Sequence, residues 1–251
     1  MKTIQQKLMI VFSILMLVLT GTGFVTTLFV PRSMRKEQRR IEEIIRQKQE
    51  EAAKAREEAK AKAAGNKPLT LAEMQDLYDD ASEMNIIMVG DSVMLAAYDA
   101  LQAQFPNAYI DAVFGRAIGE STQALQDLAD KNQLSTVVVL SVGTNSTITD
   151  DQVEKLIDIC GERPVFFITT YGVTNDSNKK QAEVAAKHDN AYIIDWESLA
   201  MEHMNEYILA DHLHPNEEGS KAYAKLIDDE ITKDLDLKGH NDEADKDKTK
   251  E

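Results

Sequence analysis

The chain consists of blocks with very different hydrophobic patterns. Residues 8–30 are apolar and uncharged, residues 32–64 are charged, and the following stretch alternates short apolar runs with amphipathic ones. The last residues contain almost no apolar side chain. The pattern therefore predicts four segments, which are a membrane anchor (1–31), a charged helical stalk or linker (32–67), a globular domain (68–236) and a disordered acidic tail (237–251).

The first block has the length and composition of a single membrane span. Leu8–Val30 carries no charge and is long enough to cross a bilayer core of roughly 30 Å at ~1.5 Å per residue. A cleaved signal peptide is the alternative, but the apolar run exceeds the roughly 7–15 residues of a signal core. We expect an uncleaved anchor. The orientation of this anchor stays open. The positive-inside rule alone would place the part of the chain after the span in the cytoplasm, because basic residues follow the span. These residues are Arg32, Arg35, Lys36, Arg39 and Arg40.

The second block is typical of a solvated helix. Arg32 to Ala64 is rich in Glu, Lys, Arg, Gln and Ala, which are good helix formers. Glu50 and Lys54 have the spacing of an i,i+4 ion pair. Because apolar heptads do not persist, we expect a helical stalk and no long coiled coil. Gly65 and Pro68 end it.

The third block predicts an α/β domain. Apolar runs predict strands at Ile86–Val89, Ala108–Phe114, Thr136–Ser141, Val165–Thr169 and Ala191–Ile194. Amphipathic stretches predict helices at Val93–Gln104, Ser121–Lys131, Asp150–Cys160, Ser177–Lys187 and Asn216–Lys233. Thr70 and Glu73 have the spacing of a capping box, which predicts a short helix from Thr70 to about Ser82. Continuous apolar strands suit a sheet that is covered on both faces. Strands that alternate with helices favour a mainly parallel five-stranded sheet in a three-layer sandwich.

Charge and cysteine content narrow the possible partners. The formal net charge of −15 argues against nucleic acid, because phosphates require a basic surface. Cys160 is the only cysteine, so no intramolecular disulfide can form.

The first predicted strand ends in Gly90-Asp91-Ser92 and leads directly into a helix. Sites in parallel sheets lie beyond the carboxyl ends of the strands. A serine at a helix start lies near free backbone N–H groups and the positive end of the helix dipole, which favour an oxyanion. The alternative is that Asp91 or Ser92 only caps the helix.

Polar and glycine residues also follow the next two predicted strands. Gly115 could direct its N–H toward an oxyanion, and the Asn145 amide in Gly143-Thr144-Asn145 is a neutral donor suited to the same task. The alternatives are a turn glycine and an Asn that makes a local turn.

A fourth group, Asp211-His212-Leu213-His214, precedes the last predicted helix. A nucleophilic serine needs a base, and the base needs an acceptor that orients it. Asp211 and His214 could supply both. His212 and His214 also form an H-x-H pair, but no further ligand set of known spacing accompanies it. We therefore expect neither a metal nor another cofactor.

Taken in order, these motifs resemble the SGNH (GDSL-type) hydrolases, and the resemblance covers roughly Asn85 to Ile231. It implies a flavodoxin-like α/β fold, Ser92 as nucleophile, His214 as general base and Asp211 as its orienting carboxylate. It also implies an oxyanion hole made of the Ser92 N–H, the Gly115 N–H and the Asn145 side chain. Gly119 also fits the general family pattern at the second position.

The chain resembles one branch of this family more closely than the others. Its motifs Gly115-Arg116, Asp195-Trp196 and His214-Pro215-Asn216 are similar to those in the extracytoplasmic domain of Gram-positive peptidoglycan O-acetyltransferases. The resemblance implies acetylation of cell-wall glycan outside the membrane. In that branch a multi-span acyltransferase domain delivers the acetyl groups, whereas this chain has one predicted span. It could be a fragment of a longer protein or depend on a separate multi-span partner. A GDSL-type esterase or lysophospholipase and a non-catalytic surface binding protein remain the alternatives.

Overall fold

The computed structural model describes residues 39–53, 68–173 and 176–238. The chain divides into two compact units, Met1–Glu43 and Ile44–Glu251, and every strand within the described residues lies in the second. Within the described ranges, no helix combines the length and the apolar character needed to cross a membrane. The predicted anchor at 1–31 lies outside these ranges, as does the tail from residue 239 onward.

A single parallel sheet forms the centre of the second unit. Its spatial order is β2-β1-β3-β4-β5, and each neighbouring pair is parallel. The predicted α/β class and five-stranded parallel sheet are therefore confirmed. The strands are β1 (Ile86–Gly90), β2 (Tyr109–Ala112), β3 (Val137–Ser141), β4 (Val165–Ile168) and β5 (Ala191–Ile194).

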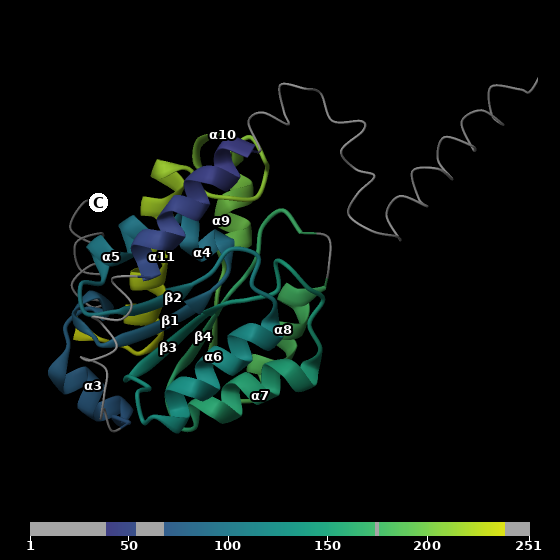
Figure 1. Cartoon of the computed structure of the whole chain (residues 1–251). Coiled ribbons are helices and arrows are strands. Elements are labelled where there is room, and N and C mark those ends of the chain that lie inside the picture. The colour runs from purple at the N-terminus through teal and green to yellow at the C-terminus, as the bar shows by residue number, and fades with distance from the viewer. Residues whose placement is uncertain (1–38, 54–67, 174–175, 239–251) are drawn as a thin grey trace, which may run out of the picture. The chain divides into compact units, whose positions relative to one another are not determined.

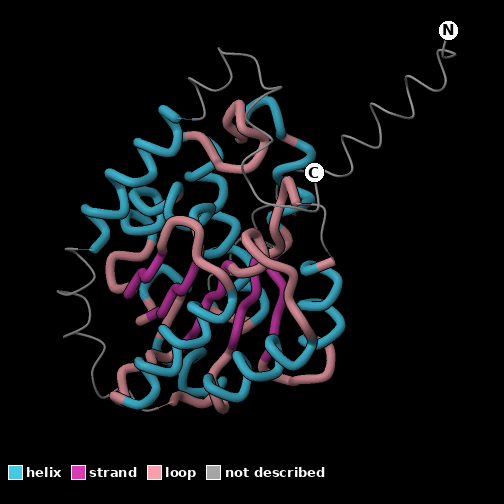
Figure 2. Tube along the Cα trace, turned by 45° about the vertical axis from the view of Figure 1, so that its right-hand side comes forward, coloured by secondary structure: helices cyan, strands magenta, loops and turns pink. Residues whose placement is uncertain are grey.

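Helices cover both faces of this sheet (Figures 1 and 2). On one face α6, α7 and α8 pack in sequence, and on the other α11 packs against α5 and α9. The sheet is therefore the middle layer of three. The helices are α3 (Leu71–Leu77), α4 (Ser92–Ala96), α5 (Tyr98–Gln104), α6 (Ile118–Asp130), α7 (Asp150–Cys160), α8 (Ser177–Ala185), α9 (Trp196–Glu202), α10 (Met204–Tyr207) and α11 (Glu217–Asp234), with a 3₁₀ turn η2 at Ala81–Glu83.

Apolar side chains join the layers into a dry core. Ile87 and Leu140 of the sheet pack with Leu125, Leu156 and Val184 of α6, α7 and α8, and all five are fully buried. Truncating one such side chain to alanine typically costs about 2–5 kcal/mol of stability. This rigid core fixes the carboxyl edge of the sheet, from which the candidate site residues extend.

The strand order creates a reversal in the direction of chain winding. From β1 the chain moves outward to β2, then crosses back to β3 on the other side of β1. At such a switch point the loops after neighbouring strands separate and leave room for a ligand. The candidate nucleophile follows β1, so it lies at this point.

Three local features differ from the sequence prediction. The helix predicted over Val93–Gln104 is two helices that meet at Ala97, whose N–H is shared between the carbonyls of Val93 and Met94. No glycine or proline marks this tightened turn. The predicted helix from Thr70 ends at Leu77, and η2 follows separately. The short helices α9 and α10 were not predicted, because they bury few residues and show little apolar periodicity.

Residues 44–53, which are helical, supply buried side chains within the second unit. Ile45 and Ala52 are 2% and 3% exposed. Lys48 Nζ lies 2.6 Å from the Asp99 carboxylate and donates to the Ala96 carbonyl at the end of α4. At the other end of the domain Leu237 is also fully buried. Residues assigned from the sequence to the stalk and the tail thus contribute to packing, although the segment boundaries themselves stay predictions.

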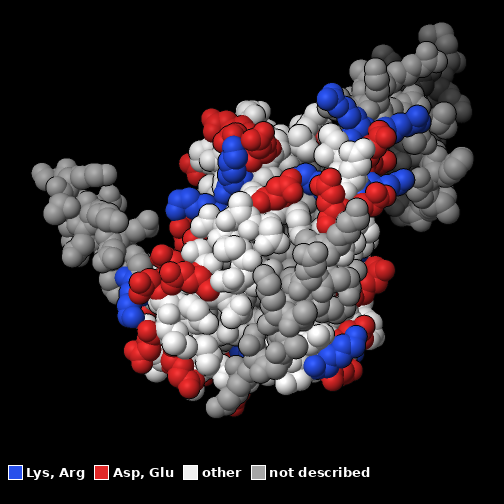
Figure 3. Space-filling model, turned by 60° about the vertical axis from the view of Figure 1, so that its left-hand side comes forward, with Lys and Arg blue, Asp and Glu red and all other residues white. Residues whose placement is uncertain are grey.

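Acidic side chains gather around the edge of the face drawn in Figure 3, and basic side chains are scattered among them. This distribution agrees with the net charge of −15.

Candidate active site

Ser92 is the first residue of α4, immediately after β1. The carboxylate of Asp91 accepts a hydrogen bond from the Val93 N–H at 3.0 Å and so caps the helix. Ser92 is only 3% exposed, and its hydroxyl is left to other partners. The capping function of this motif therefore belongs to Asp91, while Ser92 takes a position at the carboxyl edge of the sheet.

His214 connects Ser92 to Asp211. Its Nε2 lies 2.8 Å from Ser92 Oγ, and its Nδ1 lies 2.6 Å from Asp211 Oδ2. Because a carboxylate only accepts hydrogen bonds, Nδ1 carries the proton in this arrangement and Nε2 is left to accept from the serine hydroxyl. The three side chains thus form one line of hydrogen bonds suited to removing the serine proton.

Asp211 also shapes the loop that carries His214. Its Oδ1 accepts from the backbone N–H groups of Leu213 and His214 at 3.0 and 3.1 Å. Burial raises the pKa of the Asp211 carboxyl, but hydrogen bonds and charge from His214 together with these backbone bonds outweigh burial, and the pKa ends below its usual value. A carboxylate that stays ionised can hold the imidazole in one tautomer and stabilise the imidazolium that forms.

His212 does not join this arrangement. It has a positive φ of 59° and an exposed side chain, and both ring nitrogens of His214 already have partners in Ser92 and Asp211. Within the described ranges, no three metal-ligating side chains converge.

Gly115 and Asn145 lie in the loops after β2 and β3. Gly115 has a φ of 70°, a conformation that favours glycine. Asn145 Nδ2 donates to the carbonyl oxygen of Arg116 at 3.2 Å, so the two loops are tied together. Gly119, the alternative from the sequence, lies in the first turn of α6.

Sequence reasoning missed Gly172, which lies in the loop after β4 with a φ of 77°. A Cβ at this position would lie 2.3 Å from the carbonyl oxygen of His212. The loop that carries Asp211 and His214 therefore packs directly on this glycine. Its position shortly after a predicted strand was the available signal.

Two other buried ionisable groups, Asp91 and Cys160, are poorly suited to the roles of Asp211 and Ser92. Burial raises the pKa of Asp91, which disfavours the ionised carboxylate that an orienting residue requires. Burial also raises the pKa of Cys160 to about 12, so this thiol stays neutral and is a poor nucleophile.

Comparison with known proteins agrees with the resemblance seen in the motifs. The chain is 32% identical over 157 residues to the O-acetyltransferase OatA of Staphylococcus aureus, a match that covers 59% of this chain and 25% of that protein. It is 29% identical over 155 residues to the putative peptidoglycan O-acetyltransferase YrhL of Bacillus subtilis, covering 59% of this chain and 24% of that protein. The chain thus spans about a quarter of the length of these curated relatives. No family model matches it.

A solved structure shares the fold. The C-terminal catalytic domain of peptidoglycan O-acetyltransferase A from Streptococcus pneumoniae, solved with a methylsulfonyl adduct, superposes with a TM-score of 0.52 at 23% identity. The match covers 58% of this chain and 90% of that domain. The chain is therefore similar in sequence to bacterial O-acetyltransferases and shares the fold of one such catalytic domain, in agreement with the resemblance seen in its motifs.

We predict that Gly172→Ala lowers kcat for a small acetyl ester, because its Cβ would push the His212 carbonyl and displace His214. Gly161→Ala is the matched control, since Gly161 also has a positive φ but open space around it. Both variants should lose about 1–2 kcal/mol of unfolding free energy from left-handed backbone strain. Steady-state kinetics and chemical denaturation measure the two effects. An equal change of kcat in both variants would contradict the packing account.

Proposed function

We propose that this chain is an SGNH serine O-acyltransferase or esterase that works through an acyl group on Ser92. The observation that carries the proposal is the position of His214, within hydrogen-bond distance of both Ser92 Oγ and Asp211. A serine, a base and an orienting carboxylate in this order are the elements of nucleophilic acyl transfer. The similarity to O-acetyltransferases supports the same chemistry.

In the first half-reaction, His214 Nε2 accepts the Ser92 proton while Oγ attacks the carbonyl carbon of an acetyl ester. The tetrahedral intermediate carries its negative charge on the former carbonyl oxygen. The Ser92 N–H, the Gly115 N–H and the Asn145 amide stabilise this oxyanion. When the intermediate collapses, His214 gives the proton to the departing alcohol oxygen, and an acetyl-serine remains.

In the second half-reaction, an acceptor hydroxyl replaces the departed alcohol. His214 Nε2 removes the hydroxyl proton as the oxygen attacks the acetyl carbon. Collapse of the second oxyanion returns the proton to Ser92 Oγ and releases the acetylated acceptor. Water in place of the acceptor gives free acetate, so transfer and hydrolysis differ only in which hydroxyl reaches the acyl-serine.

Peptidoglycan glycan is the acceptor class that we propose. The curated relatives include peptidoglycan O-acetyltransferases, and the apolar segment at 1–31 would anchor the enzyme in the cell membrane with its catalytic domain outside. A separate multi-span acyltransferase would then supply acetyl groups. A membrane-anchored acetylesterase or lysophospholipase with the same Ser92 chemistry is the second candidate.

We expect Ser92→Ala to lose hydrolysis of a small acetyl ester to the background level, whereas Ser121→Ala, at a buried serine of α6, retains it. Asn145→Ala should lower kcat by ~10²–10³, because it removes one oxyanion donor. Steady-state kinetics measure all three variants. Full activity of Ser92→Ala, together with no labelling of the wild type by an active-site serine phosphonate, would favour a non-catalytic binding protein.

The second prediction separates transfer from hydrolysis. With a small acetyl ester as donor and peptidoglycan oligosaccharides as acceptor, the wild type should yield O-acetylated oligosaccharide, detected by mass spectrometry. His214→Ala should yield none, because no base activates either hydroxyl. Free acetate without acetylated glycan would reject the transferase and leave the esterase.

A further inference from the structure

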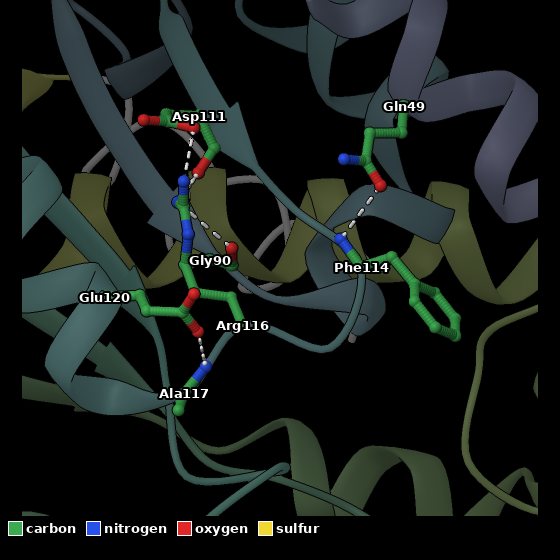
Figure 4. Close-up of polar contacts among 7 residues, drawn as sticks. All are labelled: Gln49, Gly90, Asp111, Phe114, Arg116, Ala117 and Glu120. Atoms are coloured by element: carbon green, nitrogen blue, oxygen red, sulfur yellow. Dashed lines mark hydrogen bonds and ion pairs between the residues drawn. The ribbon is translucent and has the colours of Figure 1, made fainter.

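Arg116, in the loop between β2 and α6, places its guanidinium in a nearly closed environment. Its side chain is 8% exposed, and that of Asp111, its ion-pair partner, is 9% exposed. One guanidinium nitrogen lies 2.8 Å from Asp111 Oδ1, and the other donates to the Asp111 carbonyl at 2.5 Å and to the Gly90 carbonyl at 3.4 Å (Figure 4). This one side chain therefore connects the carboxyl ends of β1 and β2.

Arg116 is linked to one proposed oxyanion donor by a hydrogen bond and to the other two through one or two residues of backbone. Gly90 precedes Ser92 by two residues, and Gly115 is the residue directly before Arg116. The carbonyl oxygen of Arg116 accepts from Asn145 Nδ2 at 3.2 Å. An amide nitrogen has two hydrogens, so this bond orients the Asn145 amide and leaves one hydrogen for an oxyanion.

Two other side-chain contacts of the loop are exposed. The Glu120 carboxylate accepts from the Ala117 N–H at 2.9 Å, and the Gln49 amide oxygen accepts from the Phe114 N–H at 3.3 Å (Figure 4). Charge pairs act more strongly in a buried setting than at the surface, and removing one partner leaves an uncompensated buried charge. Among these contacts the Arg116–Asp111 pair is therefore the one on which the loop depends most.

We infer that Arg116, paired with Asp111, is a positioning residue that fixes the oxyanion hole, an inference that rests on the proposed acyl-serine chemistry. Arg116 touches no reacting atom in this account. It acts through the Gly115 backbone and the Asn145 amide. A merely structural ion pair would affect the stability of the fold, whereas a positioning pair also affects the rate of the chemical step at unchanged substrate affinity.

Arginine suits this task better than lysine would. Its planar fork can donate to the Asp111 carboxylate, the Asp111 carbonyl and the Gly90 carbonyl in fixed directions, whereas a lysine ammonium is a flexible point charge. Arg116→Lys thus keeps the charge but loses the geometry. This substitution separates the positioning effect from the loss of a buried charge.

The test measures kcat and KM of Arg116→Lys with a small acetyl ester. We expect kcat to fall about 10- to 100-fold with KM within about twofold, because ground-state binding does not use the oxyanion hole. The matched control is Arg163→Lys. Arg163 also donates to two backbone carbonyls, those of Ser135 and Cys160, but it precedes β4 at the opposite edge of the sheet. Its variant should change thermal stability and leave kcat unchanged.

A double-mutant cycle makes the test specific. In an Asn145→Ala background, Arg116→Lys should lower kcat by less than it does in the wild type, because part of its effect passes through the Asn145 amide. Unchanged kcat in Arg116→Lys, or effects of the two substitutions that multiply independently, would overturn the inference. If Arg116→Lys does not fold, Asp111→Asn is the second variant, because it removes the charge of the partner while keeping its shape; it too should lower kcat at nearly unchanged KM, and an unchanged kcat would overturn the inference.

The outcome also separates this inference from the proposed function. Activity that disappears in Ser92→Ala but is unaffected by Arg116→Lys would overturn the positioning role alone. Activity that survives Ser92→Ala would overturn the acyl-serine chemistry itself.

Discussion

The imidazole of His214 joins two residues that lie far apart in the sequence, and the proposed chemistry depends on this contact. Ser92 and His214 are separated by 122 positions, yet Nε2 and Oγ lie 2.8 Å apart. The contact exists because β1 delivers Ser92 to the carboxyl edge of the sheet while the loop before α11 returns His214 to the same edge. Asp211 then holds the ring through Nδ1 and the loop through two backbone N–H groups.

The fold was largely predictable because the strands are continuous apolar runs. The predicted strand Ala191–Ile194 and helix Asp150–Cys160 have the observed bounds, and the other strands differ by a few residues at their ends. The capping box at Thr70 is confirmed, with Glu73 accepting from the Thr70 N–H at 2.7 Å. The break at Ala97 was not predictable, because it depends on how α4 and α5 pack and no breaking residue marks it.

For the candidate site, the sequence showed the residue types and their order after the strands. It did not show the contacts by which other residues hold them in place. Gly172 gave only the weak signal of a loop glycine, since its importance comes from a carbonyl of a loop 40 positions later in the chain. Asp111 lay inside a predicted strand and Arg116 was only part of the Gly115-Arg116 motif, because the reach of the guanidinium to Asp111 and the end of β1 is a tertiary contact. Such contacts join residues of different loops and strands, and the local pattern of hydrophobic and polar residues does not indicate them.

The measurement that tests the central claim most directly is detection of the acetyl group on the enzyme. Wild-type protein is mixed with an acetyl ester, quenched with acid during turnover, digested and analysed by tandem mass spectrometry. The account predicts one added acetyl group on the side chain of Ser92, formed within the time of a single turnover and absent from Ser92→Ala. Turnover with no acetyl group on Ser92, or with the group on another residue at a competent rate, would contradict it.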